Sequence, residues 1–311
     1  MVVGAQFYAP GAAEALEQLS EPGRVLSRFQ AVINVETAQG RLLAVQVPGP
    51  ALGPFGLVLA QARFPGWPAP GTAAWVQGRR LRIGPLAIDV GLARPAPVIE
   101  VAPPGKAWDP SRLATLLGPF AEQSAFGRIW AGSDARGVGD PVEQAVRRLA
   151  AAVTMRPENL AAVEQAAVRI MGRGPGATPS GDDLLVGFLA AWMVCRPRHL
   201  ATQSLIQALV EQAPTRTTRL AGEFYYHLTR GRLSEPLAIL LRAVTAGTDR
   251  QVLAAARSLA SYGATSGLDT IAGVGCYLRA CGRAWPRPTT DRAPGRESAQ
   301  PHRPTDGFEG G

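Results

Sequence analysis

The part of the chain best suited to do chemistry is residues 172–183, which read Gly-Arg-Gly-Pro-Gly-Ala-Thr-Pro-Ser-Gly-Asp-Asp and lead directly into an apolar run. Glycine permits backbone angles that other residues avoid, and proline stiffens the path between the glycines. The spacing from Ser180 to Asp183 predicts the capped start of a helix, where free backbone N–H groups bind a carboxylate or a phosphate. The adjacent acids Asp182 and Asp183 repel each other, which a simple cap does not require.

A second copy of this motif lies further along the chain. Residues 266–273 (Ser-Gly-Leu-Asp-Thr-Ile-Ala-Gly) match residues 180–187 (Ser-Gly-Asp-Asp-Leu-Leu-Val-Gly) at the serine, the aspartate and both glycines. If the two helices pack side by side, Asp182, Asp183 and Asp269 converge, and Asp182 and Asp269 approach within about 10 Å of each other. Such a cluster can hold Mg²⁺, orient a substrate amide or accept a proton. The plainer alternative is two ordinary capped helices.

Two groups of residues make up the predicted site. The catalytic group is the three carboxylates, Asp182, Asp183 and Asp269. The second group would bind a small anionic substrate through backbone N–H groups and hydroxyls, and comprises Gly174, Gly176, Thr178, Ser180, Gly181, Thr265, Ser266 and Gly267. We expect no cofactor at this site, although Mg²⁺ remains possible because carboxylates are its preferred protein ligands.

The elements that must position these residues change character near residue 105. Before it, short aliphatic runs punctuated by glycine and proline predict strands at 31–35, 41–47, 56–60, 81–83 and 86–90. After it, apolar residues recur at helical spacing over 142–155, 158–171, 182–195, 199–212, 218–230, 235–246, 250–261 and 267–280. We therefore predict an α+β protein: a small barrel-like or sandwich-like β domain over 1–104, an α-helical bundle over 105–284, and a disordered tail over 285–311.

Composition narrows the classes of function. The net charge of +8 is spread thinly along the chain, whereas nucleic-acid binders concentrate their charge on one face, so we expect no nucleic-acid partner. The longest apolar run, residues 184–195, is too short for a bilayer, which needs about 20 residues. The first residues do not have the pattern of a signal peptide. Three cysteines in apolar settings indicate reduced thiols. Together these features favour a cytoplasmic protein that does not bind membranes.

The two glycine–aspartate segments, GRGPGATPSGDDLLVGFLAA and GATSGLDTIAGV, resemble the signature segments of the DUF2877 family, over about residues 20–282. One member of that family is a subunit of the oxamate carbamoyltransferase of anaerobic allantoin breakdown, a branch of purine catabolism. The resemblance implies a component of a carbamoyltransferase-like enzyme that moves a carbamoyl group between phosphate and a small amide-bearing acid such as oxamate. It also implies that other transferase subunits are partners.

Other readings of the same residues stay open. The three aspartates could instead hold Mg²⁺ or Mn²⁺ in a hydrolase that acts alone. A third possibility is a non-catalytic subunit that binds an anion or serves as a scaffold. Arg216 and Arg219 could clamp a carboxylate, or lie on the surface as solvated side chains. Four aromatic residues among glycines and prolines would form a partner surface or fill a small core: Phe55, Phe64, Trp67 and Trp75.

Overall fold

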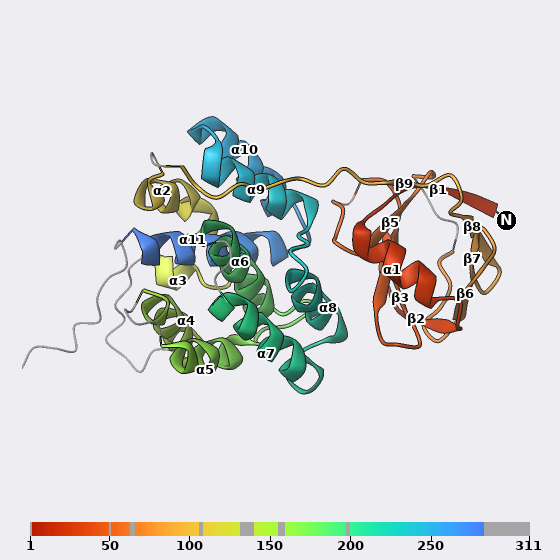
Figure 1. Ribbon diagram of the computed structural model, residues 1–311, viewed down its shortest axis with the longest axis horizontal. Helices are drawn as coiled ribbons and strands as arrows, with labels where there is room; N and C mark the ends of the chain where they lie inside the picture. Colours follow the sequence, from red (N-terminus) through yellow and green to blue (C-terminus); the bar gives the residue numbers. More distant parts are fainter. Residues whose placement is uncertain are drawn as a thin grey trace, which may run out of the picture.

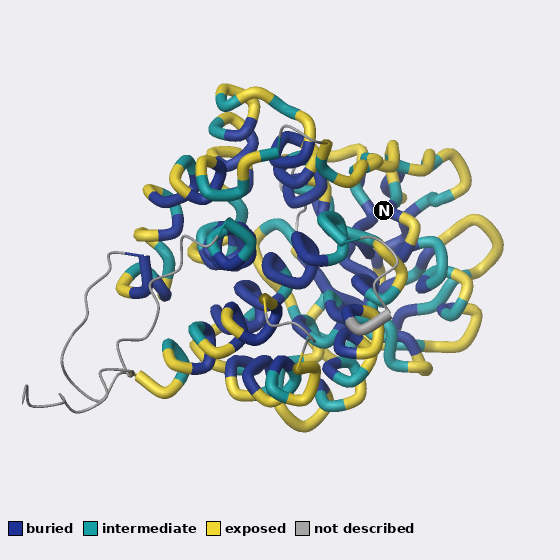
Figure 2. The backbone as a smooth tube through the Cα atoms, turned by 60° about the vertical axis from the view of Figure 1, so that its left-hand side comes forward, coloured by how far each residue is buried: buried dark blue, intermediate teal, exposed yellow. Residues whose placement is uncertain are grey.

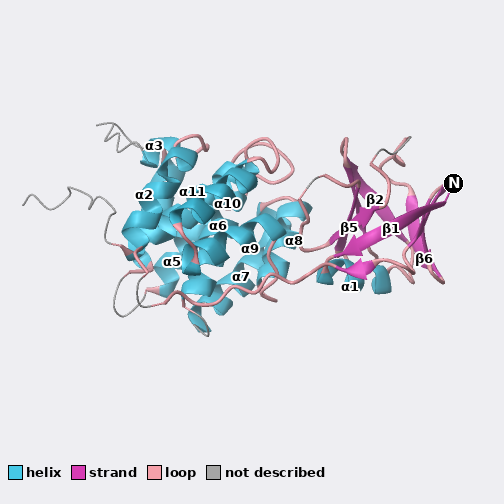
Figure 3. Ribbon diagram, turned by 90° about the horizontal axis from the view of Figure 1, so that it is seen from above, coloured by secondary structure: helices cyan, strands magenta, loops and turns pink. Residues whose placement is uncertain are grey.

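The computed structural model describes residues 2–49, 51–62, 66–105, 108–130, 140–154, 159–196 and 200–282. Strands gather in one part and most helices in the other, joined by an extended segment (Figures 1 and 3). Buried backbone lies in the interior of both parts, and exposed backbone lies along their outer surfaces (Figure 2). No helix of the described residues is long and apolar enough to cross a membrane. The predicted tail, 285–311, falls outside the described residues.

The N-terminal part is a closed β-barrel, which confirms the predicted fold of this region. Its sheet order is β5-β4-β3-β2-β6-β7-β8-β1-β9, and β1 also pairs with β5, so that the sheet closes on itself. Closure leaves few unpaired strand edges. The strands are β1 (Val2–Tyr8), β2 (Gly23–Arg28), β3 (Val32–Glu36), β4 (Leu42–Gln46), β5 (Gly56–Leu59), β6 (Ala73–Gln77), β7 (Arg80–Ile83), β8 (Leu86–Asp89) and β9 (Arg94–Pro95).

The sequence placed residues 1–30 in the β domain but identified no individual strand or helix among them. The predicted strands started at residue 31, whereas β1, β2 and the helix α1 (Pro10–Gln18) come before them. The partners of β1 are β5, β8 and β9, which are distant in sequence, so no local hairpin signal marks it. Helix α1 starts with Pro10 and buries Ala12 and Ala15 in the barrel core. It therefore closes one side of the barrel.

The C-terminal part is helical, as predicted. Its helices are α2 (Pro110–Ala121), α3 (Gly127–Trp130), α4 (Pro141–Ala152), α5 (Leu160–Ile170), α6 (Ser180–Cys195), α7 (Leu200–Arg216), α8 (Arg219–Leu228), α9 (Glu235–Ala246), α10 (Asp249–Ala260) and α11 (Ser266–Cys281). Apolar periodicity identified α4 to α11, but not α2 or α3. Helices α6 and α11 lie along each other in the middle of the bundle (Figure 1). Both have long buried stretches, because their sequences are apolar on nearly every side.

Helix α8 joins the two parts. Leu220 and Phe224 of this helix pack against a small apolar cluster on the barrel that includes Phe55. Two ion pairs lie beside this contact: Arg219 Nη2 is 2.7 Å from Glu36 Oε1, and an arginine just after α8 reaches α1. The barrel is therefore held against the bundle by both apolar packing and paired charges.

Two of the aromatic residues considered for a partner surface are buried. Phe55 is 2% exposed and Trp67 is 9% exposed, with the Trp67 indole N–H donating to the carbonyl of Gln30 at 3.1 Å. Trp75 is half-buried on β6, and Phe64 falls outside the described residues. Phe55 and Trp67 therefore fill core positions, and the alternative of a partner surface that includes them is wrong.

Candidate functional site

The two motifs meet through close contact between α6 and α11. A Cβ added to Gly187 would lie 2.0 Å from the carbonyl oxygen of Thr270, and one added to Gly273 would lie 2.0 Å from that of Leu184. Leu184 and Thr270 hold the same position in their motifs, as do the two glycines, so the contact is reciprocal. The final glycine of each motif thus lets the two helix backbones touch. The juxtaposition expected from the repeat is what the structure shows.

The second residue of each motif is also a contact glycine. A Cβ at Gly181 would lie 2.1 Å from the carbonyl oxygen of Ile170, at the end of α5. A Cβ at Gly267 would lie 1.8 Å from that of Leu259, near the end of α10. Each motif helix therefore starts against the end of the helix that precedes it, and only glycine leaves room for this approach.

Two of the backbone N–H groups that the sequence assigned to an anion pocket, those of Gly181 and Gly267, are used within the fold. Gly181 N donates to the carbonyl of Arg173 at 2.8 Å, and the N–H groups of Asp182 and Asp183 both donate to that of Pro179. Gly267 N donates to the carbonyl of Tyr262 at 3.0 Å. These donors are already bonded, so they do not offer an anion the set of free N–H groups that P-loop-like sites provide. Gly174 and Gly176, at φ of 107° and 102°, lie in the exposed loop before α6.

The two serines do not cap their helices, which corrects the capping interpretation. Pro179 occupies the cap position of α6 and Thr265 that of α11, and neither makes a side-chain cap bond. Ser180 and Ser266 are instead the first residues of their helices. Each hydroxyl crosses to the carboxyl of the other motif: Ser180 bonds Asp269, and Ser266 bonds Asp183. The two motifs therefore bond to each other in a reciprocal way, as their final glycines do through backbone contacts.

Asp183 has the most unusual setting of the three carboxyls. It is 9% exposed and accepts hydrogen bonds from the hydroxyls of Ser266 and Thr178, which are themselves 2.9 Å apart. Its Oδ2 atom is buried and has no partner among the described residues. Burial raises the pKa of Asp183 to about 7, against the lowering effect of the two hydroxyls, and the charges of Asp269 and Asp182 raise it further.

Asp269 occupies the equivalent position on α11 but faces protein. It is fully buried, and its Oδ1 accepts a hydrogen bond from the backbone N–H of Ala125 at 2.9 Å. The hydroxyls of Ser180 and Thr265 also bond to it, while burial raises its pKa. Asp269 therefore ties the segment before α3 to α11.

Asp182 is turned away from the other two carboxyls and ties three segments together. Its Oδ2 accepts from the backbone N–H of Gly172 at 3.0 Å and from the hydroxyl of Thr217 at 2.6 Å, and its Oδ1 accepts from the hydroxyl of Tyr225 at 2.7 Å. The residue is 1% exposed, and burial raises its pKa. These bonds join the glycine loop, the end of α7 and α8.

The three bonds to Asp182 predict a structural effect for Asp182→Asn. An amide replaces one acceptor oxygen with a donor, so at least one buried partner loses its bond. We expect the free energy of unfolding to fall by about 1 to 3 kcal/mol. The sequence-based capping interpretation predicted less than about 1 kcal/mol. Urea unfolding of Asp182→Asn beside Thr217→Val, which removes a single donor, measures the difference. Unchanged stability with lost ligand binding would instead assign Asp182 to the site.

A cavity of about 680 Å³ lies between the barrel and the bundle, and Asp183 is part of its wall. Thr178, Ser266 and Tyr262 lie on the bundle side, and Asn34 and Gln46 on the barrel side. Apolar side chains form much of the remaining wall: Phe29, Val32, Phe55, Val186, Leu220, Phe224, Leu228, Leu233 and Leu237. A mostly apolar cavity with a few polar groups is typical of small-molecule sites.

The barrel residues of the cavity were not among the predicted site residues. Asn34 and Gln46 are buried amides, 2% and 3% exposed, on the neighbouring strands β3 and β4. The Asn34 amide donates to the hydroxyl of Ser27 at 2.9 Å. A buried amide inside an apolar strand is a signal that sequence reasoning can use, because such a group needs partners. Tyr262, just after α10, carries no comparable signal.

Positive charge is scarce in the cavity. Arg232 is the one cationic side chain among its described lining residues, and its Nη2 lies 2.6 Å from Glu14 Oε1 on α1. Arg219 is engaged by Glu36 and by the carbonyl of Gly40, and it does not line this cavity. Arg216 lies in a separate shallow cleft beside Arg173. The proposed arginine clamp therefore does not face Asp183.

The carboxyls do not form a metal site in the described part of the chain. No group of three or more histidine, cysteine, aspartate or glutamate side chains there is arranged to hold a metal ion. Both oxygens of Asp182 accept hydrogen bonds from protein groups, among them Thr217 and Tyr225, and one oxygen of Asp269 accepts from Ala125. The residues present therefore do not fit the three-aspartate Mg²⁺ cluster that the sequence allowed.

A closed barrel followed by a bundle built around two matching glycine–aspartate helices defines a two-part protein, with the cavity that Asp183 lines between the parts. Comparison with known families identifies the family to which it belongs. The family model for the AllH N-terminal domain matches residues 3–95, and the model for oxamate carbamoyltransferase subunit AllH matches residues 170–278. The chain belongs to the AllH family, which agrees with the resemblance seen in the sequence. No solved structure matches the chain.

Proposed function

We propose that this chain is the subunit of a carbamoyltransferase that binds the amide end of the substrate, with Asp183 as the amide acceptor. The observation that carries the proposal is the unpartnered, buried Oδ2 of Asp183 in the wall of the cavity. A buried polar atom without a partner is costly in a protein interior unless a ligand or water satisfies it. An N–H group of a carbamoyl or amide ligand is a suitable partner.

The groups around Asp183 support this role. The hydroxyls of Ser266 and Thr178 donate to its carboxylate and so favour the charged form, which is the better hydrogen-bond acceptor. The apolar wall formed by Phe55, Phe224 and their neighbours excludes water and strengthens that bond. Asp183 would thereby fix the orientation of the carbamoyl NH₂ group.

The proposed reaction is carbamoyl transfer between phosphate and a small acid of the oxamate type. Starting from oxalurate, a phosphate oxygen attacks the carbamoyl carbon and the bond from that carbon to the oxamate nitrogen breaks. The nitrogen takes a proton, and the products are oxamate and carbamoyl phosphate. Phosphate, the substrate carboxylate and the developing negative charge on the carbonyl oxygen all require positive groups or free N–H donors.

This chain supplies few such groups at the cavity. The N–H groups at the start of α6 are mostly bonded internally, and Arg232 is paired with Glu14. The family description names a subunit, which supports the proposal that a second protein contributes the missing charge. In this proposal, the phosphate subsite lies at the interface with that second protein.

The partner requirement gives a direct test. We expect the purified chain alone to show no phosphate-dependent conversion of oxalurate, because Arg232 is the one cationic side chain among the described residues that line its cavity, and Arg232 is paired with Glu14. Mixing it with the products of adjacent genes should restore formation of carbamoyl phosphate, measured by coupled synthesis of ATP. Full activity from the isolated chain would contradict the incomplete site. Tight oxamate binding without turnover in any mixture would favour the non-catalytic binding subunit.

A further inference from the structure

The neighbouring strands β3 and β4 turn one face to the barrel core and the other face to the bundle. Ile33 and Val45 pair with each other across the two strands and belong to the barrel core. Because side chains alternate along a strand, Asn34 and Gln46, which follow them in sequence, point to the opposite face. Helix α8 packs over this outer face, so both amides are buried although they lie outside the barrel core.

The Asn34 side chain has one group bonded to protein and one group without a partner. Its Nδ2 donates to the hydroxyl of Ser27 at 2.9 Å. Its Oδ1 accepts no hydrogen bond from any residue that the structure describes. Asn34 is 2% exposed and lines the same cavity as Asp183. A buried carbonyl oxygen without a partner is costly, so a ligand that donates an N–H to it gains a stabilising contact.

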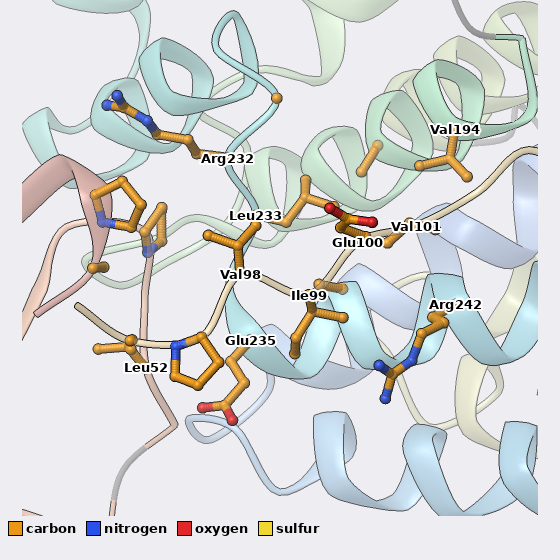
Figure 4. Close-up of a pocket in the computed structure, with 18 of the residues that line it drawn as sticks. Leu52, Val98, Ile99, Glu100, Val101, Val194, Arg232, Leu233, Glu235 and Arg242 are labelled. Atoms are coloured by element: carbon orange, nitrogen blue, oxygen red, sulfur yellow. The ribbon is translucent and has the colours of Figure 1, made fainter. Parts of the chain in front are cut away.

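A second cavity, of about 760 Å³, differs in the setting of its polar groups. It lies between residues 96–102, the barrel and helices α6 and α9. Figure 4 shows Glu100, Glu235 and Arg242 around it, and all three residues are exposed. Water satisfies exposed charged groups, so these residues do not require a ligand. The buried oxygen of Asn34 therefore makes the cavity beside Asp183 the better fit for a ligand with N–H groups.

We propose that Asn34 Oδ1 accepts a hydrogen bond from the nitrogen to which the carbamoyl group is attached, and so selects N-carbamoyl substrates. The inference rests on the proposed function, in which Asp183 takes the terminal NH₂ group. The two acceptors belong to the barrel wall and the bundle wall of one cavity. An N-carbamoyl acid such as oxalurate has N–H donors on two nitrogens, one for each acceptor, whereas a carboxylate or a phosphate brings only further acceptors.

This contact would position the leaving group of the proposed reaction. The bond that breaks joins the carbamoyl carbon to the nitrogen that Asn34 contacts. Asn34 would hold that nitrogen while Asp183 holds the carbamoyl group, which keeps the two sides of the breaking bond in place. A side-chain amide is neither an acid nor a base near neutral pH, so Asn34 positions the substrate and moves no proton.

The test compares two ligands of the assembled complex: oxalurate, and its derivative methylated on that nitrogen. Calorimetry without phosphate measures both affinities with no turnover. The methyl group removes one N–H and leaves the terminal NH₂ group for Asp183. We expect the natural complex to bind oxalurate at least about 10-fold more tightly, because the derivative leaves the Asn34 oxygen unpaired. In Asn34→Ala the two affinities should lie within about 3-fold of each other, since no such oxygen remains.

Ser27→Ala is the matched control for Asn34→Ala. Both variants lose the hydrogen bond between the two side chains, but Ser27→Ala keeps the oxygen of Asn34. Both should therefore lose a similar amount of stability in urea unfolding, while only Asn34→Ala should lose the preference for oxalurate. An equal loss of that preference in the two variants would make the role of Asn34 structural and overturn the inference.

The outcomes separate this inference from the proposed function. A natural complex that binds both ligands equally overturns the inference without any variant, because the Asn34 oxygen then has another partner, such as water. If oxalurate binding depends on Asp183 but Asn34→Ala keeps the preference, the proposed function stands and the inference fails. A preference that depends on Asn34 while Asp183→Asn binds normally supports the inference and removes the proposed role of Asp183. Absence of oxalurate binding removes both.

Discussion

Asp183→Asn is expected to lower turnover of the assembled enzyme by about 100-fold or more while the chain stays folded. The asparagine has nearly the same shape but cannot present a charged acceptor to the substrate N–H, and a substrate misplaced by about 1 Å can react about 100-fold more slowly. Asp182→Asn is the neighbouring control, since its carboxyl is bonded to protein on both oxygens. Equal losses of turnover in the two variants would contradict a special role for Asp183.

The same substitution should alter how stability depends on pH. Because burial raises the pKa of Asp183 to about 7, the folded chain holds this proton between about pH 4 and 7, where the unfolded chain has released it. Stability therefore falls as pH rises through that window and levels off above it. Asp183→Asn removes this titration, which changes the free energy of unfolding by up to about 4 kcal/mol between low and high pH. Urea unfolding at pH 5 and pH 8 should show a smaller pH difference in the variant than in the natural chain.

The second large effect is structural. Gly273→Ala should unfold the bundle or cost about 3 kcal/mol or more, because the new methyl group would lie 2.0 Å from the carbonyl oxygen of Leu184 and 2.8 Å from Phe188 N. These atoms belong to the backbone of α6 and cannot rotate aside. The two helices would have to separate, and with them the bond between Ser266 and Asp183.

Gly222→Ala is the matched control for the glycine prediction. Gly222 lies within α8, where a new Cβ would meet only the methyl carbon of Ala213, at 3.2 Å. We expect its effect on the free energy of unfolding to stay within about 1 kcal/mol, since alanine favours the helix. Equal melting temperatures for Gly273→Ala and the natural chain, in a calorimetric scan, would show that α6 and α11 are not packed as the structure has them.

The repeat of the motif was enough to predict that α6 and α11 meet, because a small residue at a fixed offset in two apolar helices indicates close packing. The roles of individual residues were harder to predict. Ser180 has the spacing of a helix cap, yet it bonds to Asp269 on the other helix. Local spacing describes neighbours along the chain, whereas this hydroxyl is held by a carboxyl from the second motif.

The different surroundings of the two adjacent aspartates also could not be predicted from the sequence. Asp182 and Asp183 differ only in which way the helix turns them: one faces Thr217 and Tyr225, the other faces the cavity. The barrel half of the cavity depends on how the barrel sits on α8, which no local pattern encodes. Periodicity therefore predicted most helices, but not which of the motif carboxyls the fold places in the wall of the cavity.

The most direct test of the account is the affinity for oxamate as a function of pH, measured by calorimetry on the assembled complex and on its Asp183→Asn variant. If the Asp183 carboxylate accepts the substrate amide, affinity should rise as pH passes upward through about 7, where the pKa of this group lies, and the variant should bind more weakly with no such rise. Equal affinities for the two proteins across the range would contradict Asp183 as the ligand-binding residue.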